Sequence, residues 1–119
     1  SSFLGQDTPI FEIRDHAGDS SDLLIRTAAL GDALSTTLGT NPVVLMRGHG
    51  ATMVGDSVPQ AVFRAIYAAE NGSLQSAAVQ LGVDVTYLTQ GEVLAATASN
   101  NSFIHRAWDL WVRDAEQDG

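Results

Sequence analysis

The stretch that decides the fold is PVVLMRGHGATMVG, residues 42–55. An apolar, β-branched run leads to a histidine between two glycines, and a second apolar run follows it. Gly48 and Gly50 allow a tight turn with positive φ between two strands. The stretch therefore predicts a β-hairpin that presents the imidazole of His49 at its turn.

A strand and a helix are predicted before this hairpin. Residues 9–14 alternate weakly between apolar and polar side chains, which predicts a short strand. The polar, turn-rich residues 15–22 lead into a helix. That helix ends at Gly39, a typical C-terminal stop. Its apolar positions share helical spacing: Leu23, Leu30, Leu34 and Leu38.

Helices dominate the predictions after the hairpin. Ser57 begins a capping-box pattern that opens a long helix ending at Gly82. Residues 83–88 alternate with period two and predict a strand. A second capping box, Thr89 to Glu92, opens a short helix that residues 99–101 interrupt. The last helix carries one apolar stripe: Ile104, Trp108, Trp111 and Ala115. This order of elements indicates an α+β or α/β/α layered domain.

Composition restricts the function classes. The 119 residues suffice for one domain, and the formal net charge is −8. The six basic residues are all arginines scattered singly along the chain, so we expect no nucleic acid partner. A small anionic substrate fits better, because one or two arginines can bind a carboxylate. No apolar run approaches the ~20 residues of a membrane span. The absence of cysteine excludes thiolate chemistry and fits a cytoplasmic protein.

Two residues of the hairpin turn could carry chemistry. A neutral imidazole presented as in His49 suits a metal ion, whereas the alternative is a turn histidine whose ring bonds a backbone carbonyl. Arg47 precedes it by two residues and shares its side of the sheet if the strand alternation continues. Arg47 either positions an anionic substrate beside a metal or is a solvated charge at the end of a strand.

No other local pattern points to a catalytic site. His16 is expected to cap or to be solvated in a turn, and His105 is expected to be solvated on a helix. Neither forms a His-x-His or His-x-x-x-His pair. Nucleophile elbows and phosphate-binding glycine loops are absent from the sequence. Ser1 would suit an N-terminal nucleophile, but nothing near it supports that role.

The hairpin and its flanks resemble a known family. Residues 43–50, then Val54-Gly55-Asp56-Ser57 and the alanine-rich helix from Pro59, resemble the class II aldolase/adducin family. That family pattern is a strand, an Asn-His-Gly or Gly-His-Gly turn, a second strand and a Ser-capped helix. Weaker resemblances are found at residues 11–15 and 87–92, so nearly the whole chain is covered.

The resemblance implies a fold and a metal site. Family members form an α/β/α sandwich around a largely antiparallel sheet and assemble as homotetramers. They use a divalent metal ion such as zinc or manganese, held by three histidines, and His49 matches the last of these. The other two histidines and an acid–base glutamate would precede Ser1. We therefore expect residues 1–119 to be the C-terminal portion of a single family domain.

The resemblance also implies an activity. Gly48, the Arg14-Asp15 pair and the segment at 87–89 look closest to decarboxylases of hydroxylated aromatic or pyridine dicarboxylates. The implied function is a metal-dependent carbon–carbon lyase in which Arg47 holds a substrate carboxylate. A sugar-phosphate aldolase or epimerase is the near alternative. A non-catalytic, adducin-like assembly module is the alternative from another class.

Overall fold

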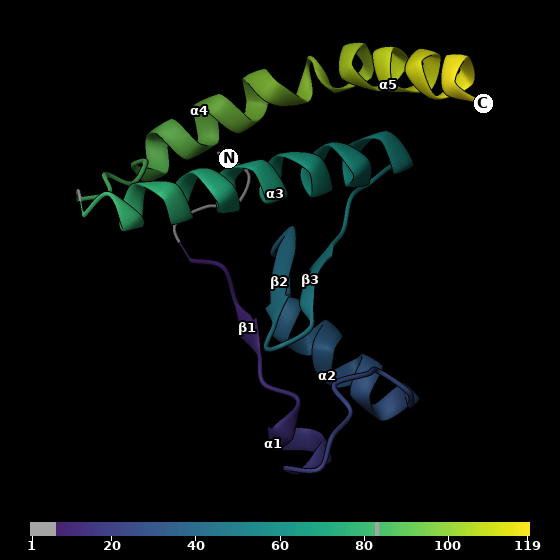
Figure 1. Cartoon of the computed structure of the whole chain (residues 1–119), viewed down its shortest axis with the longest axis vertical. Coiled ribbons are helices and arrows are strands. Elements are labelled where there is room, and N and C mark those ends of the chain that lie inside the picture. Colours follow the sequence, from purple (N-terminus) through teal and green to yellow (C-terminus); the bar gives the residue numbers. More distant parts are fainter. Residues whose placement is uncertain (1–6, 83) are drawn as a thin grey trace. The chain divides into compact units, whose positions relative to one another are not determined.

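The computed structural model describes residues 7–82 and 84–119, which form three strands and five helices (Figure 1). The elements in chain order are β1 (Ile10–Phe11), α1 (Arg14–Ala17), α2 (Ala28–Leu38), β2 (Val43–Met46), β3 (Gly50–Met53), α3 (Val58–Gln80), α4 (Gln90–Asn101) and α5 (Ile104–Asp118). They divide into two compact units, one spanning residues 7–54 and one beginning at Gly55. The predicted α/β class is confirmed.

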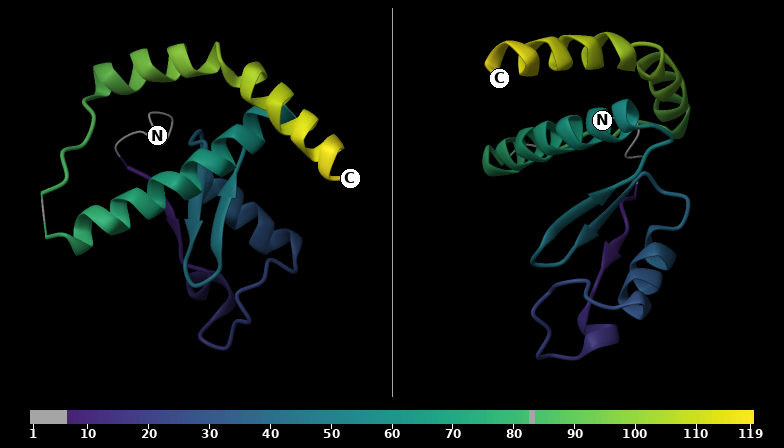
Figure 2. Two further views of the ribbon diagram at one scale, coloured as in Figure 1. Left: turned by 45° about the horizontal axis from the view of Figure 1, so that its top comes forward. Right: turned by 90° about the vertical axis from the view of Figure 1, so that its right-hand side faces the viewer.

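The first unit is a small mixed sheet with one covering helix. β2 lies between the other two strands, parallel to β1 and antiparallel to β3 (Figure 1). Parallel strands need a crossover connection, and the segment containing α2 supplies it. α2 contacts β1 and β2 and lies along one face of the sheet (Figure 2). The hairpin predicted around His49 is confirmed.

The core of this unit lies between the sheet and α2. Phe11, Ile13 and Val44 are its largest fully buried side chains, and Val44 is completely enclosed. The partly buried residues packed around them are Leu23, Ile25, Leu30, Ala33, Leu34 and Leu38. Burial of these branched and aromatic side chains removes apolar surface from water, which fixes the strands beneath the helix.

The helix predicted from Leu23 begins later, at Ala28. Thr27 is its N-cap, and the Thr27 hydroxyl accepts a hydrogen bond from the Leu30 N–H at 3.2 Å. Leu23 instead has a φ of +67°, which lies outside the range of a right-handed helix. Leu23 still packs on the core from an irregular segment, so its helical spacing to Leu30 was misleading. The stop at Gly39 is confirmed, with a φ of +56°.

The second unit is helical in its described residues. α3 contacts α5, where Phe63 and Tyr67 pack near Trp111. The capping box of α4 forms as predicted, with reciprocal bonds between Thr89 and Glu92.

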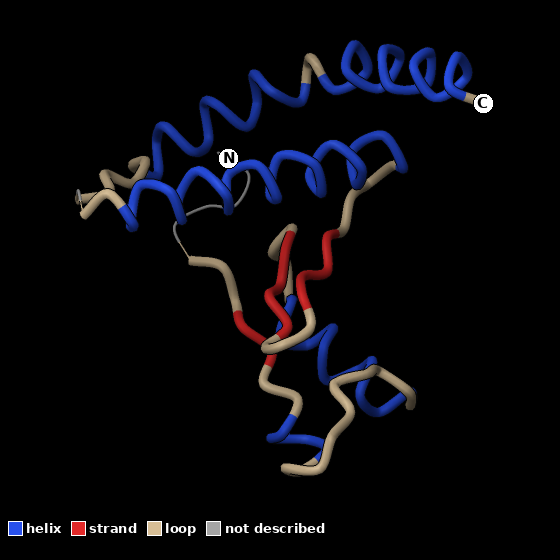
Figure 3. The backbone as a smooth tube through the Cα atoms, in the orientation of Figure 1, coloured by secondary structure: helices blue, strands red, loops and turns tan. Residues whose placement is uncertain are grey.

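Two predictions for this unit need correction. At α3, the Gln60 side chain accepts from the N–H of Asp56 rather than from Ser57, so the box is shifted by one residue. The strand predicted at 83–88 is wrong for residues 84–88, which are irregular (Figure 3), and Val83 lies outside the described residues. Alternation alone does not make a strand when no neighbouring strand pairs with it.

None of the helices in the described part of the chain combines the length and apolar character needed to cross a membrane.

Candidate functional site

The turn between β2 and β3 consists of Arg47, Gly48 and His49. The N–H of His49 donates to the carbonyl of Met46 at 3.0 Å and closes this turn. Gly48 has a φ of +71°, a conformation that favours glycine. A Cβ at Gly48 would also lie 3.2 Å from Cδ1 of Leu23. Backbone conformation and the neighbouring side chain therefore both select glycine at this position.

Arg47 and His49 belong to the turn rather than to a strand. The expectation that Arg47 and His49 lie on the same strand is wrong, because β2 ends at Met46. The N–H of Arg47 donates to the carbonyl of Phe11 at 3.2 Å, which ties this end of the turn to β1. Arg47 is thereby fixed at its backbone, and His49 follows two residues later in the turn.

The imidazole of His49 is exposed. Within residues 7–82 and 84–119, its ring has no hydrogen bond, ion pair or ring contact. The alternative interpretation, in which the His49 ring donates a hydrogen bond to a backbone carbonyl, is therefore not what the structure shows among the described residues. No group of three or more metal-ligating side chains occurs among the described residues either. His49 can supply one ligand, but the described part of the chain does not complete a metal site.

A carboxylate between two arginines lies beside this turn. Glu12 Oε2 is 2.6 Å from Arg47 Nε and 2.8 Å from Arg14 Nη2. Arg14 also donates to Glu12 Oε1 through its Nε and through its backbone N–H, each at 3.0 Å. Arg14 therefore binds the carboxylate in the bidentate manner that guanidinium groups favour. We call these three residues the Glu12 cluster.

Electrostatics of the Glu12 cluster favour the charged carboxylate. The side-chain hydrogen bonds from Arg14 are the largest cause, and they lower the pKa of Glu12 from 4.5 to about 2. The hydrogen bond from Arg47 acts in the same direction. Glu12 is thus an anion at neutral pH, and the cluster carries one net positive charge in a chain whose formal charge is −8.

Sequence reasoning missed Glu12. Parallel pairing aligns Ile10 with Leu45 and Phe11 with Met46, and the same register places Glu12 beside Arg47. The signal in the sequence was a single acidic residue between two apolar residues, Phe11 and Ile13. Both of these neighbours are buried in the structure. Such a position on a strand points away from the core. Its pairing with Arg47 could not be read from local spacing, because Arg47 lies in the turn after β2, more than thirty residues away in the sequence.

The remaining predicted residues lie elsewhere. His16 belongs to α1, and its ring stacks on Phe11 with centroids 5.5 Å apart and planes inclined by 12°. His105 is exposed on α5, as predicted. Ser1 lies outside the described residues.

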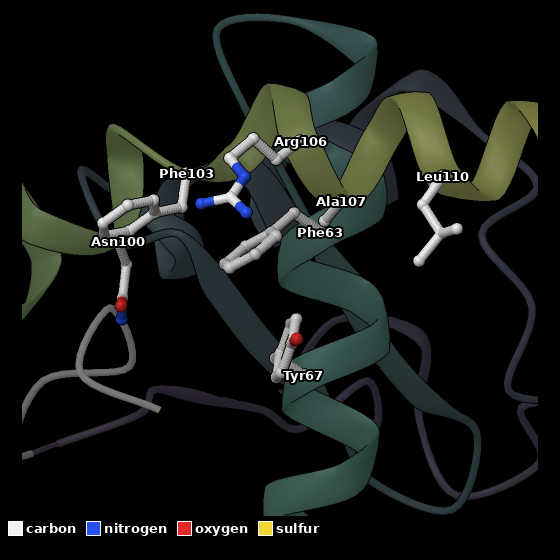
Figure 4. Close-up of a pocket in the computed structure, with 7 residues that line it drawn as sticks. All are labelled: Phe63, Tyr67, Asn100, Phe103, Arg106, Ala107 and Leu110. Carbon is white, nitrogen blue, oxygen red and sulfur yellow. The ribbon is translucent and has the colours of Figure 1, made fainter.

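A cavity of about 460 Å³ is present in the second unit. The side chain of Arg106 extends toward the rings of Phe63 and Phe103 (Figure 4). The complete lining is Phe63, Tyr67, Asn100, Phe103, Arg106, Ala107 and Leu110. Neither Arg47 nor His49 lines this cavity, and no prediction from the sequence included its aromatic residues.

Comparison with known proteins decides the family. Residues 3–75, more than half of the chain, match the family described as "Class II Aldolase and Adducin N-terminal domain". The chain belongs to the class II aldolase and adducin family. The matched residues include the whole first unit, with the Glu12 cluster and the His49 turn. The resemblance inferred from the hairpin is thereby confirmed.

Three curated proteins are similar to the chain. Decarboxylase tropJ of Talaromyces stipitatus is 35% identical over 139 aligned positions, which cover all of this chain and 52% of that protein. The 3,4-dihydroxyphthalate decarboxylase of Rhodococcus jostii is 40% identical over 60 residues, covering 50% of this chain and 25% of that enzyme. The enzyme of the same name from Terrabacter sp. is 46% identical over 44 residues, 37% of this chain and 18% of the enzyme. The chain thus spans about half the length of tropJ.

Proposed function

We propose that this chain is part of a decarboxylase that acts on a hydroxylated aromatic carboxylate. The observation that carries the proposal is the 35% identity to a decarboxylase along the entire chain. The names of two shorter matches, both 3,4-dihydroxyphthalate decarboxylases, suggest the kind of substrate. Such a substrate combines an aromatic ring, hydroxyl groups and two carboxylates.

The reaction makes specific demands on a protein. The bond between the ring and one carboxylate breaks, CO₂ leaves, and the electron pair stays on the ring until a proton replaces the lost group. The other carboxylate is retained and can serve as a handle for binding. Positioning by such a handle contributes to the rate because the reacting bond is then held in a defined orientation. Arg47 is our candidate for binding that retained carboxylate, since its guanidinium lies at the surface beside the His49 turn.

His49 is our candidate metal ligand. Class II aldolases generally depend on a divalent metal ion, which supplies a Lewis acid for substrate oxygens when it is bound. The described residues offer a single exposed imidazole and no ligand cluster, so they do not fit a complete site alone. We therefore propose that His49 joins ligands from outside the described residues.

The proposal is tested with the complete protein that carries this chain. It is incubated with 3,4-dihydroxyphthalate, and released CO₂ and the aromatic product are measured together. We expect stoichiometric CO₂ and dihydroxybenzoate. Metal content and CO₂ release should both fall in His49→Ala and stay unchanged in His105→Ala, a matched exposed histidine on α5.

Other results would favour the alternatives. Cleavage of a sugar phosphate without CO₂ release would indicate an aldolase. A folded protein with neither activity nor bound metal would indicate an assembly module. We also propose a cytoplasmic homotetramer, which sedimentation of the purified protein and fractionation of cells would test.

A further inference from the structure

The outward face of the β1–β2 pair combines charge with exposed apolar surface. Phe11, Ile13 and Met46 point into the core and are at most 9% exposed. The alternate residues point the other way, and Ile10 and Leu45 are 65% and 43% exposed. Ile10 and Leu45 are register partners. Glu12 and Arg47 follow directly after the ends of β1 and β2, and their ion pair joins the two segments there. Two apolar side chains and the Glu12 cluster therefore share one face of the first unit.

Glu12 determines which edge of the Arg47 guanidinium is available. The guanidinium is a planar fork whose N–H groups are arranged on two edges. Glu12 Oε2 lies 2.6 Å from Nε of Arg47, so it occupies the edge of the guanidinium that includes Nε. The opposite edge, formed by Nη1 and Nη2, has no partner among the described residues. This second edge has the geometry that binds a carboxylate through two parallel hydrogen bonds.

Arg14 makes this arrangement rigid. It binds both oxygens of Glu12 and also donates its backbone N–H, so three contacts hold the carboxylate before Arg47 adds a fourth. A long arginine side chain otherwise loses considerable rotamer entropy when it binds a ligand. Fixing Arg47 in advance lowers that loss, which is how preorganisation increases affinity.

We propose that this face is a binding site for an aromatic carboxylate. The Nη1–Nη2 edge of Arg47 binds the carboxylate, Ile10 and Leu45 contact the ring, and Glu12 is a positioning residue that aims Arg47. The identification of this ligand with the retained part of the substrate rests on the proposed function. The binding site itself rests on the register, the exposed fractions and the contacts of the Glu12 cluster.

Phthalate and succinate are suitable probes because both are dicarboxylates and only phthalate has a ring. Binding to the complete protein is measured by isothermal titration calorimetry, with the Arg Nε–Hε signals followed by NMR. We expect phthalate to bind more tightly than succinate and Arg47→Lys to weaken phthalate binding. Ile10→Ser should weaken phthalate binding while leaving succinate binding unchanged.

The decisive variant is Glu12→Gln. It keeps the size of the side chain but removes the charge that orients Arg47. We expect its dissociation constant for phthalate to rise about tenfold, the lower end of what a hydrogen bond to a charged group contributes. In the assay with 3,4-dihydroxyphthalate, KM should rise while kcat changes little, because the positioning contact is the same in ground and transition states.

Asp22→Asn is the matched control. Asp22 pairs with Arg26 at 2.7 Å in the same unit, and both side chains are more than half exposed. This variant loses an ion pair of the same kind but should bind phthalate like the unmodified protein. If Glu12 had only a structural role, Glu12→Gln and Asp22→Asn would change the melting temperature equally, and neither would change phthalate binding.

The outcomes separate this inference from the proposed function. Phthalate binding that depends on Glu12 supports the site even if the protein releases no CO₂. Decarboxylation that continues with an unchanged KM in Glu12→Gln overturns the site and leaves the proposed function intact. Failure of phthalate to bind, or binding unaffected by Arg47→Lys, also overturns it.

Discussion

Replacing Gly48 by alanine should destabilise the protein, because two features of the His49 turn require glycine. The φ of +71° costs a residue with a side chain about 1–2 kcal/mol. The added Cβ would also lie 3.2 Å from Cδ1 of Leu23, which must shift by a few tenths of an ångström. Alanine also lowers the conformational entropy of the unfolded chain, which stabilises the folded state and offsets about 0.4–1 kcal/mol of this cost. The net loss in the free energy of unfolding is about 1 kcal/mol.

Gly72→Ala is the matched control, with the opposite sign. Gly72 lies inside α3, is exposed and has no atom within 4 Å of an added Cβ. Alanine there should raise the free energy of unfolding by about 0.5–1 kcal/mol. Asparagine tolerates a positive φ better than alanine does, so Gly48→Asn should lower the free energy of unfolding less than Gly48→Ala. Urea unfolding of the three variants measures these differences. A Gly48→Ala variant as stable as Gly72→Ala would refute the reasoning about the turn.

Three further predictions concern the core, the Glu12 cluster and a helix cap. Val44→Ala empties part of the fully buried core and should cost about 2–3 kcal/mol in urea unfolding; a loss below half of that would mean that the core closes around the cavity. The pKa of Glu12 is lowered in the folded protein, so its stabilisation is present above pH 4.5 and is lost as the pH falls toward about 2. The difference in unfolding free energy between the unmodified protein and Glu12→Gln should therefore shrink over that window, and a constant difference would contradict it. Thr89→Ala removes the N-cap of α4 and should cost about 1 kcal/mol, seen as reduced helicity by circular dichroism, whereas Ser76→Ala at an exposed position near the C-terminal end of α3 should change little.

Local signals in the sequence predicted several elements correctly. The two glycines around His49, the stop at Gly39 and the Thr89–Glu92 capping box each act within a few residues of their own position. Such interactions form wherever the local chain allows them, so the sequence alone is sufficient to predict them. The α/β class followed from the order of these elements.

The errors arose where distant residues decide. Leu23 packs on the core from an irregular segment, although its spacing fitted a helix. Residues 84–88 alternate like a strand but have no strand partner among the described residues. The pairing of Glu12 with Arg47 depends on the parallel register of β1 and β2, which no local pattern encodes. Tertiary context therefore determined both the wrong elements and the missed residue of the candidate site.

The most direct test is the rate of CO₂ release from 3,4-dihydroxyphthalate by the complete protein, compared with its His49→Ala and Arg47→Ala variants. We predict measurable release by the unmodified protein, a loss of at least about a hundredfold in kcat/KM for each variant, and an unchanged circular dichroism spectrum. Release at the same rate from both variants would contradict the assignment of this turn to the reaction. No release by the unmodified, metal-supplemented protein from any hydroxylated aromatic carboxylate would contradict the proposed activity itself.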